Sequence, residues 1–203
     1  FITPNNASAR LAMSGEWAWR WSRQDSLYGW AAISRFRYDT PDTSNFDDRD
    51  ELRGHVLLAY RHRFNRWLAF ELQAGTNWYH MVYIFAERSA DNNWNRILRL
   101  RPGLEYRPHP DFRLYQSFEV LANYVDYDFE SPGSVTRSNV FRKLAVDDSL
   151  RWRWGPRSSL ILDYRLQVEE NGQLFWERWS ERVLITRHSH WLQVRLQYGA
   201  PAG

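Results

Sequence analysis

The sequence predicts an all-β fold in which about ten antiparallel strands follow one another up and down. Two observations predict it: apolar and polar residues alternate with a period of two through most of the chain, and the alternating segments are joined by connections of alternating length. Between residues 98 and 107, for example, Leu98, Leu100 and Leu104 alternate with Arg99 and Arg101. This period is typical of strands with two different faces, and no segment shows the 3.6-residue period of an amphipathic helix.

The expected strands cover residues 8–22, 27–38, 52–64, 67–85, 96–107, 112–126, 140–154, 159–169, 174–186 and 191–199. Between them, short turns (SRQD, NR, PHPD, GPRS and RHSH) alternate with longer loops (DTPDTSNFDDRDE, AERSADNNWN, YDFESPGSVTRSN and EENGQ). Short connections on one edge and long ones on the other are typical of an up-and-down antiparallel meander.

The composition suits one domain and excludes several kinds of site. The chain has no cysteine, so it forms neither disulfides nor thiolate metal sites. Its longest stretch without a charged residue, residues 72–86, is too short and too polar for a transmembrane helix, which needs about 20 apolar residues. If the chain crosses a membrane, it does so with strands.

The same alternation is expected in a soluble barrel or sandwich and in a transmembrane barrel, which bury opposite faces. Three features favour the membrane. The expected strands have about 10 to 15 residues, enough for a tilted bilayer-crossing strand of about 9–11, and charged residues continue through mid-strand. Trp and Tyr, which prefer the headgroup depth of a bilayer, gather near both ends of the strands. The predicted membrane-interface aromatic residues are Trp19, Trp21, Trp67, Trp78, Tyr124, Trp152, Trp154 and Trp191.

With these alternating strands, aromatic girdles, tight turns and long polar loops, the chain resembles the porin-like outer-membrane β-barrel proteins of Gram-negative-type bacteria. The resemblance covers nearly the whole chain and involves no motif specific to one family. It implies an antiparallel transmembrane β-barrel in the bacterial outer membrane, in contact with the lipid bilayer and lipopolysaccharide. Periplasmic or lipoprotein subunits are candidate partners.

We expect residues 1–203 to form a single transmembrane barrel domain. Ten strands would place both chain ends on the long-loop edge, whereas such barrels normally keep both in the periplasm. Together with a start at Phe1, this predicts a segment of a longer chain whose barrel has about 12 or more strands. Bulges are expected at Pro102, which lacks a ladder donor, and near Asp147 and Asp148, because Asp148 otherwise falls on the lipid-facing register.

The charged residues of the strands share the register that would face the barrel interior. The predicted lumen-lining residues are Arg53, Arg61, Arg63, Glu71, Arg99, Arg101, Glu105, Arg107, Arg113, Glu119, Lys143, Asp147, Arg151, Arg153, Asp163, Arg165 and Arg195. Opposite charges on neighbouring strands would form an ion-pair lattice that stiffens or fills the barrel. The excess of arginine would attract anions into an aqueous lumen. The two interpretations are compatible.

Other candidate sites are weaker. The acidic loop holds Asp39, Asp42, Asp47, Asp48, Asp50 and Glu51, but its spacing does not match an EF-hand, so a solvated loop is expected. We also expect no metal at His188 and His190. No nucleophile, base and orienting group stand out together, so no enzyme, catalytic residue or cofactor is predicted. Basic residues alternate along strands instead of forming a patch, which argues against nucleic acid.

The predicted function is therefore an outer-membrane pore or transport or secretion conduit with an arginine-rich, anion-attracting lumen. The alternative is a non-conducting structural or binding barrel that anchors a partner protein or lipoprotein at the outer membrane. A water-filled lumen favours the first, and a lumen crossed by ion pairs or occupied by a partner favours the second.

Overall fold

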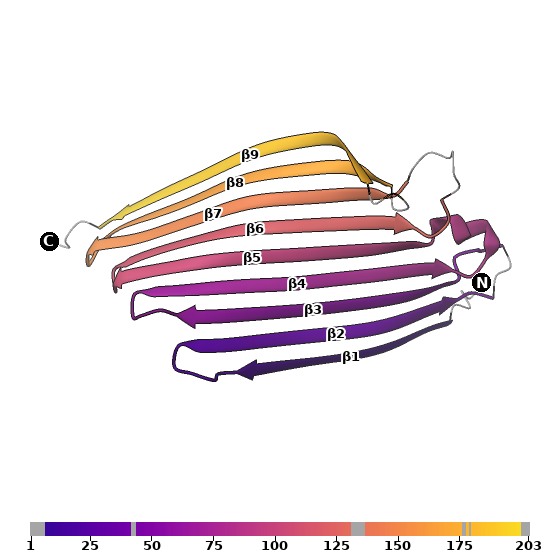
Figure 1. The fold of residues 1–203 in the computed structure, drawn as a ribbon, viewed down its shortest axis with the longest axis horizontal. Helices are drawn as coiled ribbons and strands as arrows, with labels where there is room; N and C mark the ends of the chain where they lie inside the picture. Colours follow the sequence, from indigo (N-terminus) through magenta and orange to yellow (C-terminus); the bar gives the residue numbers. More distant parts are fainter. Residues whose placement is uncertain (1–6, 42–43, 131–136, 176–177, 179, 200–203) are drawn as a thin grey trace.

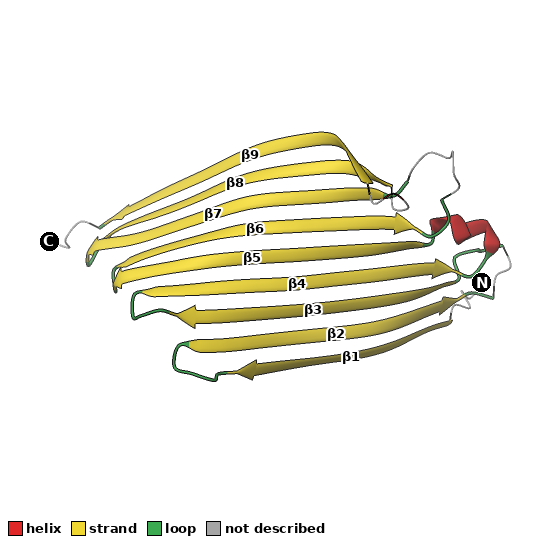
Figure 2. Cartoon of the chain, viewed as in Figure 1, coloured by secondary structure: helices red, strands yellow, loops and turns green. Residues whose placement is uncertain are grey.

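The computed structural model describes residues 7–41, 44–130, 137–175, 178 and 180–199, which form one sheet of nine antiparallel strands in sequence order (Figure 1). The strands are β1 (Ala7–Trp19), β2 (Asp25–Asp39), β3 (Arg49–Arg63), β4 (Leu68–Tyr83), β5 (Asn93–His109), β6 (Phe112–Tyr127), β7 (Asn139–Gly155), β8 (Ser158–Phe175) and β9 (Ser180–Tyr198). A short 3-10 helix, η1 (Ala86–Asp91), lies in the β4–β5 connection at the long-loop edge (Figure 2). The predicted all-β, up-and-down antiparallel fold is confirmed. The described strands are not closed into a barrel. β1 and β9 are the two edges of the sheet and do not pair with each other.

The prediction of ten strands is wrong at the C-terminal end. The segment EENGQ continues β8, and RHSH continues β9, so the last three expected strands are two longer ones. At EENGQ the chain forms a bulge between Asn171 and Gly172 instead of a loop. With nine strands, β1 starts at the long-loop edge and β9 ends at the tight-turn edge (Figure 1). The inference that both ends lie on one edge is therefore also wrong.

Neither expected bulge is present. The β5–β6 register is the same on both sides of Pro102, where Leu100 faces Val120 and Gly103 faces Ser117. The missing donor of Pro102 is thus tolerated without an extra residue. The β6–β7 and β7–β8 registers are also regular at Asp148, whose carboxylate Oδ1 accepts a hydrogen bond from Gln116 Nε2 at 2.8 Å. Asp148 therefore lies in register on the apolar face, with Gln116 as its polar partner.

The pairing gives the sheet two different faces. Residues directly opposite each other in a ladder point to the same side, so the register sorts every strand residue onto one face. We call one the charged face, which carries Arg61, Glu71, Arg99, Glu119 and Arg165, and the other the apolar face, which carries Leu11, Leu58, Leu100, Val120 and Leu192. The large side chains of the apolar face are exposed in this single-layer sheet.

Tryptophan rings cover glycines on the apolar face. Trp17 faces Gly29 across the β1–β2 ladder, and Trp78 faces Gly54 across β3–β4. A Cβ added at either glycine would overlap the facing indole ring. Glycine at these positions therefore lets a large ring lie flat against the backbone of the neighbouring strand. No helix among the described residues is long and apolar enough to cross a membrane.

Candidate functional site

The register brings the predicted lumen-lining residues to the charged face, except Arg107, which lies at the irregularity between Tyr106 and His109 and has no ladder partner. They come from β3 to β9, so strands far apart in sequence contribute to one continuous surface. The alternation in the sequence was sufficient to sort them. Which charges contact each other depends on the stagger between strands, which the alternation does not define.

Two carboxylates of this face, one at mid-strand on β6 and one towards the tight-turn end of β5, are each held between two cations. Glu119 on β6 receives Arg99 Nη2 and Lys143 Nζ, both at 2.6 Å, from the strands on either side. Glu105 on β5 receives Arg61 Nη2 at 2.7 Å and Arg113 Nε at 2.8 Å. In both cases one negative charge is shared by two positive ones.

Two further carboxylates repeat this arrangement. Asp147 lies 2.5 Å from Arg165 Nε and 3.6 Å from Arg101 Nη2. Glu51 lies 2.9 Å from Arg49 Nε and 2.7 Å from Arg53 Nη2. We call these four acids, Glu51, Glu105, Glu119 and Asp147, the shared carboxylates. Each forms a triplet with two cations, and each triplet carries a net positive charge.

Two contacts in the triplets reach over an intervening strand. Arg61 on β3 reaches Glu105 on β5 across β4, and Arg101 on β5 reaches Asp147 on β7 across β6. Beneath the second contact, Ser117 of β6 accepts hydrogen bonds from Arg101 Nε and Nη2 at 3.2 and 3.1 Å and is 2% exposed. The long charged side chains therefore cover the backbone of the charged face.

The remaining predicted acids have neutral partners. Glu71 Oε1 accepts from Gln73 Nε2 at 2.5 Å, and Asp163 Oδ1 accepts from Ser149 Oγ at 2.6 Å. Arg153 pairs with Asp111 of the β6 turn, where its Nε lies 2.6 Å from the carboxylate.

The positive charge is densest towards the tight-turn edge. Arg113 and Arg151 lie directly opposite each other on β6 and β7, and Arg195 on β9 follows across Ile161. We call Arg113, Arg151 and Arg195 the arginine row. Like charges in directly opposite positions repel. Among the described residues, no acid lies within the 4.0 Å ion-pair distance of Arg151 or Arg195.

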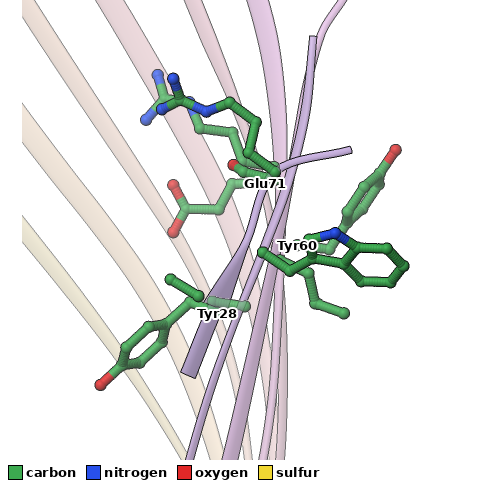
Figure 3. A pocket seen from close by; sticks show the side chains of 10 residues that line it. Tyr28, Tyr60 and Glu71 are labelled. Carbon is green, nitrogen blue, oxygen red and sulfur yellow. The ribbon is translucent and has the colours of Figure 1, made fainter. Parts of the chain in front are cut away.

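A hollow indents the sheet at the tight-turn edge of β1 to β4. Its lining includes Arg20, Tyr28, Arg61 and Glu71 of the charged face and Tyr60 of the apolar face. Figure 3 shows Tyr28 and Glu71 pointing to one side of the sheet and Tyr60 to the other. The hollow thus lies at the rim of the sheet and is not an enclosed cavity.

Most of the predicted interface aromatic residues lie towards the ends of their strands or in the turns. Trp19, Trp152 and Trp154 are near the tight-turn ends of their strands and are 46 to 62% exposed. Trp21 stacks on Tyr60 with ring centroids 5.8 Å apart, and Trp67 lies in the β3–β4 turn under Arg66. Trp78 and Tyr124 lie towards the long-loop ends of β4 and β6 on the apolar face.

Trp191 differs from the others. Its placement in a girdle depended on a turn at RHSH, and β9 runs straight through that segment. Trp191 lies near the middle of β9, opposite Arg165, on the charged face. The polar run in RHSH has the composition of a turn, which explains the error.

Arginines connect the loops at the other edge. Arg137 Nη2 lies 2.8 Å from Asp91 Oδ1, and Arg88 contacts Asp91 at 3.0 Å and Asp47 at 2.8 Å. These contacts join the β2–β3, β4–β5 and β6–β7 connections. The hydrogen bond from Arg137, followed by that from Arg88, lowers the pKa of Asp91, and the same contacts raise the pKa of both guanidinium groups.

The acidic loop does not gather its carboxylates around one point. Asp39 pairs with Arg37, Asp47 with Arg88, Asp50 with Arg35, and Asp48 accepts the Thr40 N–H at 2.6 Å. Asp42 lies outside the described residues. Within the described part of the chain, no group of three metal-ligating side chains was found, including around His188 and His190.

Three residues of the triplet network were not among the predicted site residues. Arg49 and Glu51 were assigned to the acidic loop, but β3 begins at Arg49 and carries them onto the charged face. Extending the alternation of β3 by three residues would have found them. Ser117 gives no such signal, because its role depends on the reach of Arg101 from the neighbouring strand.

Comparisons of the chain with protein-family models, curated proteins and solved structures gave no match. The geometry of the two faces is therefore the basis for assigning a function.

Proposed function

We propose that the sheet is part of the wall of an outer-membrane β-barrel that forms a pore or transport conduit, with the charged face lining the lumen. The observation that carries the proposal is that large apolar side chains are exposed over one whole face, whereas the carboxylates of the other face are covered by cations. On β5 of the apolar face, Leu98 and Leu100 are 52 and 45% exposed. On the charged face, the Glu119 side chain is 9% exposed. Such an apolar surface is stable against lipid and costly against water.

The dimensions and borders of the apolar face fit a bilayer. Its strands have 13 to 19 residues, more than the roughly 9–11 that a tilted strand needs to cross the hydrocarbon core. At the long-loop edge, the apolar band ends at outward-facing ion pairs such as Arg35 with Asp50 and Arg96 with Asp126. At the opposite edge it ends at Trp19, Trp152 and Trp154. Charged and aromatic borders of this kind suit lipid headgroups and lipopolysaccharide.

A closed wall requires more strands than the nine described. β1 and β9 run in the same direction, so they cannot pair with each other in an antiparallel ladder. Antiparallel closure takes an odd number of additional strands between these edges. We propose that such strands complete the barrel, because open edges carry unpaired backbone groups that lipid cannot satisfy.

The charge pattern supports attraction of anions. Each triplet places one carboxylate between two cations. One cation balances the charge of the carboxylate, so every triplet keeps one positive charge. Arg151 and Arg195 of the arginine row add two cations that have no acid within ion-pair distance among the described residues, and Arg113 of the row pairs with Glu105. Arginine groups lining an aqueous passage favour anions over cations.

The test is the conductance of the purified protein in a planar bilayer, with selectivity read from the reversal potential in a salt gradient. We expect anion-selective current, and selectivity that falls towards cations in the double variant Arg151→Glu/Arg195→Glu. Both arginines lie outside the triplets, so the variant leaves the ion-pair lattice intact. Arg66→Glu, at a turn outside the charged face, is the matched control and should retain anion selectivity.

The alternative function is a non-conducting barrel that anchors a partner protein or lipoprotein. The contacts of Arg61 with Glu105 and of Arg101 with Asp147 favour it, because they reach across strands and occupy space above the charged face. A barrel that inserts into vesicles but carries no current would support this function and contradict the pore. Affinity purification from outer membranes would then identify the bound subunit.

A further inference from the structure

The apolar face is interrupted by polar side chains on β6 to β9. Gln116 on β6 lies directly opposite Asp148 on β7, which lies opposite Tyr164 on β8. Gln116 Nε2 donates to Asp148 Oδ1 at 2.8 Å, and the Tyr164 hydroxyl lies 3.0 Å from His190 Nδ1 on β9. We call these four residues, Gln116, Asp148, Tyr164 and His190, the polar row.

The polar row crosses the middle of the apolar surface. Asp148 lies near the midpoint of β7, far from the headgroup borders at both ends of the strand. The residues on either side of the row on the same face are apolar: Leu114, Phe118, Val146, Leu150, Leu162 and Leu166. By contrast, the positions that continue the row on β5 and β4 carry Leu104 and Phe70.

A lipid surface does not account for this row. Acyl chains offer no hydrogen-bond donor, and among the described residues Gln116 is the one hydrogen-bond partner of the Asp148 carboxylate. An ionisable group facing hydrocarbon is costly unless a neighbouring protein surface supplies partners. Satisfying the row requires a second surface with donors and acceptors at the same depth.

We propose that the outer surface of β6 to β9 is the interface of a homodimer, whose two-fold axis runs along the membrane normal and passes between β7 and β8. This inference rests on the proposed insertion of the apolar face in a membrane. A two-fold interface brings one patch against itself. Rotation about this axis keeps each residue at the same depth in the membrane and reverses the order of the strands. β7 therefore faces β8 of the partner subunit, and β6 faces its β9.

The polar row is complementary to itself under this rotation. Asp148 meets Tyr164 of the partner subunit, so a carboxylate that needs a donor meets a hydroxyl. On β9, Leu192 lies opposite Tyr164 and His190 lies two residues away from it along the strand, so Gln116 meets the apolar end of the network and keeps its bond to Asp148. Tyr164 can donate to the partner's Asp148 while accepting from Nδ1–H of its own His190. Gln116 and Asp148 thereby connect to Tyr164 and His190 of the partner subunit, and the rotation repeats this four-residue network once. Exposed apolar side chains such as Phe118, Leu192 and Val194 surround both networks.

Cysteine cross-linking of the full chain in lipid nanodiscs tests this geometry, because the natural sequence has no cysteine. A Val146→Cys population is mixed with a Leu166→Cys population before reconstitution and oxidation. These residues face each other across the β7–β8 ladder and flank the proposed axis without belonging to the polar row. The matched control mixes Ala74→Cys with Leu100→Cys, an equivalent pair across β4–β5.

We expect a disulfide-linked dimer from the first mixture and not from the control. Equal cross-linking in both mixtures would indicate random collision and would overturn the proposal, as would a monomer in both. The variant Asp148→Leu/Tyr164→Phe should raise the dimer dissociation constant by roughly tenfold or more, since it removes a hydrogen bond to a charged group. An unchanged constant would also overturn it.

Vesicle flotation separates this proposal from the proposed function. A protein that floats with vesicles but stays monomeric, or that captures a different protein at this surface, contradicts the homodimer alone. A protein that fails to float contradicts the membrane assignment, and cross-linking in detergent then reports on the dimer independently.

Discussion

The charged face and the apolar face of the sheet differ in how far their side chains are partnered within the chain. In a soluble sheet, the apolar face is covered and the charged side chains extend into water. Here the leucines of β5 are about half exposed, whereas Glu119 and Glu51 are among the buried residues. The difference teaches that the charged residues are the organised part of this fold. They contact one another through the shared carboxylates. The large side chains of the apolar face, by contrast, are exposed and have no covering layer among the described residues.

The comparison is tested most strongly by removing one shared carboxylate. Glu119→Gln leaves Arg99 and Lys143 facing each other without the negative charge between them. We expect a loss of about 3 kcal/mol in the free energy of unfolding, because the variant weakens two charge-assisted hydrogen bonds to a buried carboxylate. Urea titration of the protein in lipid vesicles, followed by tryptophan fluorescence, measures the change.

Glu16→Gln is the control for this variant. Glu16 is on the same face, but it is exposed and accepts one hydrogen bond from Tyr28 at 3.2 Å. Its replacement should change stability by no more than about 0.5 kcal/mol. Equal losses in the two variants would mean that the triplets contribute no more than ordinary surface charges.

The apolar face is tested by placing a cation on it. In a bilayer, Leu100→Arg should cost about 2–4 kcal/mol, the penalty for arginine on the lipid side of a barrel near the midplane. Gln167→Arg places the same side chain at mid-strand on the charged face, near Glu169, and should cost much less. Unfolding titrations in vesicles compare the two. If both variants are equally stable, Leu100 does not face lipid.

The division of the sheet into two faces could be predicted from the sequence because alternation has a period of two and needs no knowledge of partners. Arg99 and Arg101 must share a face whichever strand lies beside them. The triplets could not be predicted in the same way, since the contact of Arg61 with Glu105 depends on the stagger of three strands. Polar residues caused the remaining errors. RHSH and EENGQ have the composition of turns, yet the ladder to the neighbouring strand continues through both.

The smallest expected effect on stability concerns the glycines under tryptophan rings. It compares two glycines of the apolar face, Gly54, which an indole ring covers, and Gly15, which nothing covers. In Gly54→Val the new side chain overlaps the indole of Trp78, so the ring must leave the strand it covers. Overpacking of this kind costs about 1–3 kcal/mol. Gly15→Val is the matched control, because a Cβ at Gly15 meets nothing within 4 Å and valine favours strands. We expect Gly15→Val to be neutral or slightly stabilising in the same vesicle titration. A neutral result for both would show that Trp78 moves freely, and that the apolar face is held by lipid alone and not by contacts between its own side chains.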